Sequence, residues 1–135
     1  MTDIFWPCGD LPFRLIAGMV TGLIFGSFAT MLSYRLPRGI SIILPRSHCP
    51  ACKSALRPRD LVPLLSFAAS RGKCRFCGVF TGWRYPAIEA VLMISTAAAF
   101  AILGCTVWFL IVLALTVIFV AAAAIFIEAR RRETR

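Results

Sequence analysis

Apolar residues are gathered into two long runs, and the charged residues lie between and beyond them. No charged residue occurs from Leu15 to Tyr34, and none occurs in the 38 residues from Ala90 to Ile127. A bilayer core takes about 20 apolar residues per helix, so the first run predicts one transmembrane helix at residues 15–34. A single helix over residues 87–127 would be about 60 Å long, twice the hydrocarbon thickness of about 30 Å, so the second run must fold back.

The second run has one weak point for a helix, the LGCT sequence around Gly104. Glycine is a poor residue inside a helix and a common residue at the end of one. We therefore expect a helical hairpin over residues 87–127 with its turn near residues 104–106. The predicted fold class is an all-α integral membrane protein with three transmembrane helices and a small loop between the first two.

The basic residues predict which side of the membrane each segment faces. Ten of the fifteen lysines and arginines lie within residues 35–84, four follow the second run, and Arg14 stands alone before the first. Lysine and arginine stay in the cytoplasm in short loops, so we expect the loop at 35–86 and the basic tail at 128–135 inside, and residues 1–14 outside. This bias explains nearly all of the net charge of +9, so lipid headgroups are expected as partners and nucleic acid is not.

Four of the six cysteines form two C-x-x-C pairs in this loop, with twenty-one residues between the pairs. A structural disulfide is disfavoured in the cytoplasm, and the spacing is close to that of four-cysteine zinc sites. We expect a metal site in which zinc is favoured and iron is the alternative; redox thiols and cysteines without a role are the other interpretations. A closed four-thiolate shell is structural, and it would stabilise a loop of about fifty residues that is too small for a core of its own. The expected ligands are Cys49, Cys52, Cys74 and Cys77.

Between the two pairs, the sequence LVPLLSFAAS predicts a short helix with Asp60 as its N-cap and Arg71–Gly72 at its end. Its apolar face includes Leu61 and Leu65. This face can lie either on the membrane surface or on the transmembrane helices, and the sequence leaves both possibilities open.

Small residues recur at every fourth position of the first run, at Gly18, Gly22, Gly26 and Thr30. Such a stripe lets two helices approach closely. It predicts either packing among the three helices or a face that is reserved for a partner protein.

Glu89 is an ionisable residue near the start of the second run, in the sequence GWRYPAIEA. An acid near a helix N-terminus is electrostatically favourable, and Arg84, Arg35 or Arg38 can pair with it. An ionisable group at membrane depth is also a candidate functional group, here one that holds a cationic part of a substrate. Both interpretations remain open at this point.

Together these motifs resemble the N-terminal part of the bacterial type IV prepilin peptidase/N-methyltransferase family. The similarity runs in order from GSF at Gly26 through YRLPRG, PRSHCPAC, DLVPLLS and GKCRFCG to WRYPAIEA. The resemblance implies that the four loop cysteines correspond to the metal-binding cysteines of the family. It also implies that Glu89 matches the acid of its YP-x-x-E segment and that Arg38 matches the arginine of RLPR.

The resemblance further implies a function in the maturation of type IV pilins or type II secretion pseudopilins at the bacterial inner membrane. The family cuts the prepilin leader with two aspartates and then methylates the new N-terminal amine with S-adenosylmethionine. The aspartates here are Asp3, Asp10 and Asp60, none of them in a membrane-embedded pair, so no peptidase activity is expected from this chain alone. N-methylation of the processed prepilin is therefore expected, with candidate catalytic residues Glu89, Arg84 and Arg38.

The alternative function is a non-catalytic membrane subunit whose loop is held by zinc. Such a subunit would dock a separate prepilin peptidase or its substrate. Its partner, or a second copy of the chain, would bind on the face formed by Gly18, Gly22 and Gly26.

Overall fold

A computed structural model describes residues 9–44 and 46–133 of the chain. In this part the chain forms three long helices, one short helix and two 3-10 turns, and it contains no strands apart from isolated bridges. Residues 1–8 of the expected external segment and residues 134–135 of the tail lie outside the described residues. The elements in chain order are α1 (Leu11–Arg35), η1 (Leu36–Arg38), η2 (Pro58–Leu61), α2 (Leu65–Ser70), α3 (Arg84–Leu103) and α4 (Val107–Glu133).

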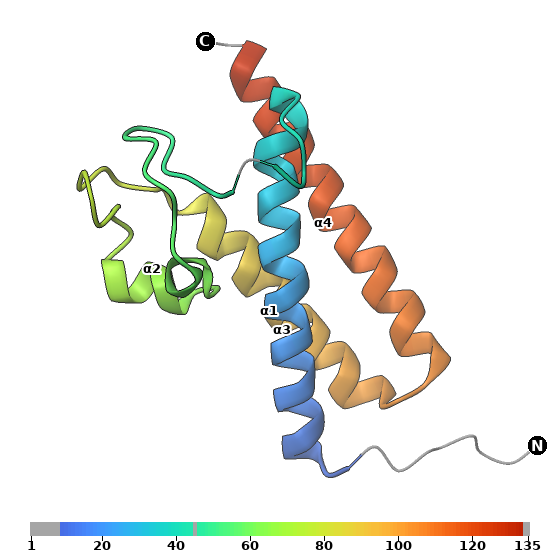
Figure 1. Cartoon of the computed structure of the whole chain (residues 1–135). Helices are drawn as coiled ribbons and strands as arrows, with labels where there is room; N and C mark the ends of the chain where they lie inside the picture. The colour runs from blue at the N-terminus through green and yellow to red at the C-terminus, as the bar shows by residue number, and fades with distance from the viewer. Residues whose placement is uncertain (1–8, 45, 134–135) are drawn as a thin grey trace, which may run out of the picture.

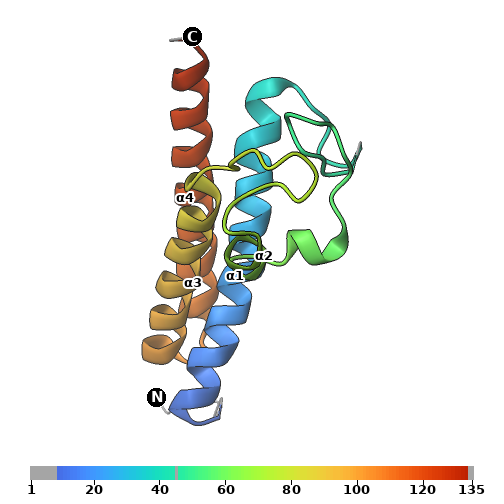
Figure 2. The ribbon, with the colours of Figure 1, turned by 90° about the vertical axis from the view of Figure 1, so that its left-hand side faces the viewer.

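The three long helices run along one another, and the segment between α1 and α3 lies on one side of them (Figures 1 and 2). Each of the three is long and apolar enough to cross a membrane. The predicted fold class, three transmembrane helices with a four-cysteine loop between the first two, is therefore confirmed.

The long helices extend beyond the charge-free runs. α1 begins at Leu11 with Asp10 at its N-cap, α3 begins at Arg84, and α4 continues through the basic segment to Glu133. Arginine and glutamate are good helix formers, so a helix need not end where its apolar run ends. Consequently Glu128, which the sequence placed in a separate tail, lies on α4.

The small-residue stripe is buried between α1 and α3. A Cβ atom on Gly22 would stand 2.5 Å from the carbonyl oxygen of Leu92, which leaves no room for a side chain. Across the same interface, the Thr96 hydroxyl donates a hydrogen bond to the carbonyl oxygen of Gly18 at 2.9 Å. The stripe therefore serves packing within the chain, and the expectation that a partner docks on the face of Gly18, Gly22 and Gly26 is wrong.

Candidate functional site

The four loop cysteines converge on one point. Their Sγ atoms all lie within 4.8 Å of one another, with 3.8 Å between Cys49 and Cys77 and 3.9 Å between Cys52 and Cys74. A tetrahedral zinc site with Zn–S bonds of about 2.3 Å has sulfur–sulfur edges of about 3.8 Å. The cluster can therefore bind one metal ion, and the two shorter separations equal the edge of a tetrahedral zinc site.

The two C-x-x-C turns have the same backbone design. In each turn, the residue after the second cysteine donates its N–H to the carbonyl oxygen of the first cysteine at 2.9 Å, from Lys53 to Cys49 and from Gly78 to Cys74. That residue adopts a left-handed conformation in both turns, with φ of 59° at Lys53 and 70° at Gly78. Glycine adopts this conformation without a steric penalty, whereas lysine does not, so the first turn carries backbone strain that the second turn lacks.

The electrostatics of the thiols also favour a bound cation. Hydrogen bonds with the side chain and backbone of Ser54 lower the pKa of Cys52 to about 6. The hydrogen bond with the Val79 backbone lowers the pKa of Cys77, but desolvation and the three neighbouring thiols raise it to about 12. Thiols this close cannot all ionise unless a positive charge offsets their repulsion. A divalent metal would supply that charge.

An aromatic cluster joins the second cysteine turn to α2 and to the start of α3. The rings of Phe67, Phe80 and Trp83 have centroids between 5.1 and 6.2 Å apart. Gly72 is buried beneath them with φ of 69°, and a Cβ atom there would stand 2.7 Å from both phenylalanine rings. Only glycine suits this position, and the cluster holds the metal-binding loop against α3.

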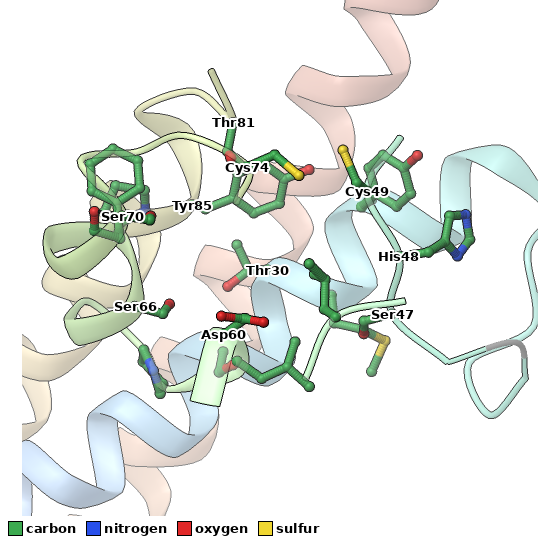
Figure 3. A pocket seen from close by; sticks show the side chains of 18 of the residues that line it. Thr30, Ser47, His48, Cys49, Asp60, Ser66, Ser70, Cys74, Thr81 and Tyr85 are labelled. Atoms are coloured by element: carbon green, nitrogen blue, oxygen red, sulfur yellow. Dashed lines mark hydrogen bonds between the residues drawn. The ribbon is translucent and has the colours of Figure 1, made fainter. Parts of the chain in front are cut away.

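A cavity of about 680 Å³ lies between α1, the loop and the start of α3. Figure 3 shows the side chains of Thr30, Asp60, Ser66 and Tyr85 around it. Ligand pockets in proteins usually measure about 300–1,000 Å³, so the cavity is large enough for a small molecule. Two of the expected metal ligands, Cys49 and Cys74, line its wall, so the metal centre and the cavity share one boundary.

Glu89 lines this cavity and is buried. Its Oε2 atom accepts a hydrogen bond of 2.8 Å from the backbone N–H of Leu64 in the loop. Leu64 has φ of 54° and ψ of −46°, a sparsely populated conformation that persists only where the surrounding structure imposes it. The acid and the loop are therefore linked directly, through a turn that the sequence did not predict.

The expected pairing of Glu89 with arginine is wrong. Arg38 instead bonds Glu128 through Nη2 and Oε1 at 2.5 Å, and Arg84 bonds the other carboxylate oxygen of Glu128. Arg35 donates to two loop carbonyl oxygens. Sequence reasoning missed Glu128 because it follows the end of the charge-free apolar run, and only the continuation of α4 brings it to both arginines. These ion pairs join the polar ends of the three long helices.

Asp60 also differs from its predicted role. Its Oδ2 atom accepts the backbone N–H of Arg57, the residue before η2, at 3.1 Å, and its Oδ1 atom pairs with Nε of Arg75 at 3.0 Å. Val62 is extended, with ψ of 116°, as is favoured before Pro63. The extended backbone at Val62 interrupts the helix expected from Asp60, so α2 begins only at Leu65.

The family comparison agrees with the motifs. Residues 20–103 match the family described as the bacterial peptidase A24 N-terminal domain. The chain belongs to this family. All of the residues that line the cavity fall within the matched segment.

Individual proteins with similar sequences are prepilin-processing enzymes. The chain is 46% identical over 80 residues to a prepilin leader peptidase/N-methyltransferase of Bacillus subtilis, covering 59% of this chain and 32% of the relative. It is 32% identical over 131 residues to a type 4 prepilin-like proteins leader peptide-processing enzyme of Escherichia coli, covering 84% of this chain and 49% of the relative. It is 37% identical over 91 residues to a prepilin leader peptidase/N-methyltransferase of Klebsiella pneumoniae, covering 63% of this chain and 38% of the relative. The chain thus spans less than half the length of these relatives, and no solved structure matches it.

Proposed function

We propose that the chain transfers a methyl group from S-adenosylmethionine to the free N-terminal amine of a processed type IV prepilin or type II secretion pseudopilin. The observation that carries this proposal is the cavity, whose lining includes a buried carboxylate and lies entirely within the family segment. The names of the Bacillus and Klebsiella relatives include N-methyltransferase activity.

The cavity suits a reaction between two groups that can each carry positive charge. S-adenosylmethionine supplies an electrophilic methyl group on a cationic sulfur, and the N-terminal amine is an ammonium before it loses its proton. Glu89 can hold either cation, because a carboxylate removed from water attracts positive charge more strongly than an exposed one. The hydroxyl groups of Thr30, Ser66 and Tyr85 can orient the polar parts of both molecules.

The candidate arginines have a different role in this proposal. Arg38 and Arg84 are held by Glu128, so we assign them to positioning the helix ends around the cavity. Zinc is the proposed occupant of the cysteine cluster. It would be structural, because four sulfur ligands leave no open position for substrate.

Donor binding tests the proposal. Calorimetry with S-adenosylmethionine should show binding to the purified chain, and Glu89→Gln should weaken it by about tenfold or more, as expected for the loss of one charge-assisted contact of about 1.5 kcal/mol or more. Glu133→Gln, which changes an exposed acid at the end of α4, is the control and should bind as the native chain does. Failure of the native chain to bind the donor, or native affinity in the Glu89 variant, would contradict the proposal.

The docking subunit remains the other candidate, but its proposed face is occupied by α3. Mass spectrometry of pilin from a deletion strain separates the two functions. Pilin that is cleaved but unmethylated supports methyl transfer, whereas uncleaved pilin supports a subunit that the peptidase requires.

We also propose that the protein resides in the bacterial inner membrane with its N-terminus outside and its cysteine loop and C-terminus in the cytoplasm. The basic residues support this orientation. Cys105, in the turn between α3 and α4, is disulfide-bonded, whereas the four loop cysteines are free thiols, and disulfides persist outside the cytoplasm. Reporter fusions in the loop and after the last residue should read cytoplasmic, and one beside Cys105 should read external. A cytoplasmic signal beside Cys105 would overturn this topology.

A further inference from the structure

The segment of the loop from the end of η2 to the start of α2 exposes several large apolar side chains. Leu61, Val62 and Leu65 are 44%, 41% and 69% exposed. Single exposed apolar residues are common in proteins, but a contiguous group of them marks an interaction surface. We call residues 61–65 the loop tip.

The loop tip lies deeper along the bundle than the polar ends of the helices. Those ends are marked by the ion pairs of Glu128 with Arg38 and Arg84. Within the tip, Leu64 bonds Glu89, which is five residues further into α3 than Arg84. Five residues correspond to about 7.5 Å along a helix. Figures 1 and 2 both show this depth: of the two elements α2 and the start of α3, α2 is the closer to the N-terminal end of α1.

The surface beside the loop tip is the apolar flank of a transmembrane helix. Ile24 and Phe28 on α1 are 63% and 47% exposed, and they line the same cavity as Leu61. This flank of α1 faces the hydrocarbon when the helix spans a bilayer. Exposed apolar side chains of the spanning helix and of the loop tip therefore border the same cavity.

Several backbone groups at and just after the loop tip have hydrogen-bond partners within the protein. The N–H of Leu64 donates to Glu89, that of Leu65 donates to the carbonyl oxygen of Pro63 at 2.5 Å, and that of Ser66 donates to the carbonyl oxygen of Val62 at 3.0 Å. Pro63 has no N–H to satisfy. Such partners lower the cost of placing irregular backbone below the membrane surface.

We propose that the loop tip inserts into the bilayer beside α1, with lipid acyl chains as its partner. Segments that lie in the membrane interface bury their apolar side chains about 5–10 Å below the headgroup boundary, and the offset of about 7.5 Å between Arg84 and Glu89 falls within this range. The insertion holds the metal-binding loop at a fixed height, with the inner end of the cavity below the membrane surface. This inference does not depend on the methyl-transfer proposal.

Photocrosslinking of the full chain in phosphatidylethanolamine–phosphatidylglycerol vesicles tests the insertion. The photoreactive residue benzoylphenylalanine is placed at Leu65 in one variant and at Val62 in a second, so that the test survives if one change disturbs the fold. The matched control is the same residue at Ala51, which is exposed in the first cysteine turn. Metal analysis of each variant identifies those with a folded loop.

Lipid adducts from Leu65 and Val62, and none above background from Ala51, are the expected result. Folded variants that give no lipid adducts at the loop tip would overturn the proposal. Equal lipid labelling at Ala51 would overturn it too, because the tip would then be no deeper than the cysteine turn. Crosslinks between two copies of the chain would overturn it in favour of a protein interface.

Discussion

Replacing Gly22 with alanine should loosen the contact between α1 and α3 more than the same change at Gly26. At Gly22 the new Cβ atom would stand 2.5 Å from the Leu92 carbonyl oxygen and 2.6 Å from the Met93 Cα atom. Both atoms belong to the backbone, so no side-chain rotation relieves the clash. At Gly26 the nearest atom is the Glu89 Cα atom at 2.9 Å, and the next two contacts are at 3.5 and 3.6 Å.

The size of the effect follows from these distances. Non-bonded carbon atoms prefer separations of about 3.5–4.0 Å, so the helices must move apart by about 1 Å to admit the Gly22 methyl group. Overpacking of this kind costs about 1–3 kcal/mol. We expect the upper end of this range for Gly22→Ala and the lower end for Gly26→Ala. A loss of about 3 kcal/mol lowers the ratio of folded to unfolded protein more than a hundredfold.

Denaturant unfolding of the purified variants in mixed micelles measures these differences. Val20→Ala is the control, because Val20 is 51% exposed on the same helix. Thr96→Ala removes a hydroxyl that also meets the Gly22 methyl group, but it leaves both backbone contacts, so combining it with Gly22→Ala should restore only part of the stability. The reasoning is refuted if the Gly22→Ala protein is no less stable than the Val20→Ala protein. It is also refuted if the Gly26→Ala protein is less stable than the Gly22→Ala protein.

Three further predictions concern the loop and the helix ends. Lys53→Gly should slow metal loss to a chelator, because glycine adopts the left-handed conformation at this position without strain. Gly78→Ala should speed metal loss, because it introduces about 1–2 kcal/mol of backbone strain at the matching position. Rates equal to that of the native chain in both variants would contradict this. Glu128→Gln should lower the free energy of unfolding in a thermal melt by about 2 kcal/mol. This is less than the loss of about 3–5 kcal/mol when a fully buried ion pair is broken, because the two arginines are partly exposed. The control, Glu133→Gln, should leave the free energy of unfolding unchanged. Cys52→Ser should abolish metal binding by elemental analysis yet leave the three helices inserted by protease protection, because insertion depends on hydropathy; retained metal or lost insertion would contradict this.

The features that sequence predicted well are those fixed by local composition. Hydropathy alone sets the three spans, and Gly104 interrupts the only run that is too long for one helix. The cysteine cluster followed from spacing, because two C-x-x-C pairs in one short loop have few ways to lie except together.

The features that sequence missed depend on contacts between distant segments. Glu128 and Arg84 are 44 residues apart, and no pattern near either one predicts their pairing. The hydrogen bond from Leu64 to Glu89 requires a positive φ at a leucine, which its residue type argues against. Periodicity showed that the glycine stripe packs closely against something, but only the fold identifies α3 as its partner.

Methyl transfer by the purified, zinc-loaded chain is the most direct measurement of the proposed activity. The chain is incubated with S-adenosylmethionine and a pilin segment that bears a free N-terminal amine, and mass spectrometry measures the product. We expect one added methyl group on the amine, at a rate that rises with pH around the amine pKa of about 8, since only the neutral amine attacks. We also expect much slower transfer by Glu89→Gln with its metal content unchanged. An unmodified amine in the presence of folded native chain would contradict the proposed function.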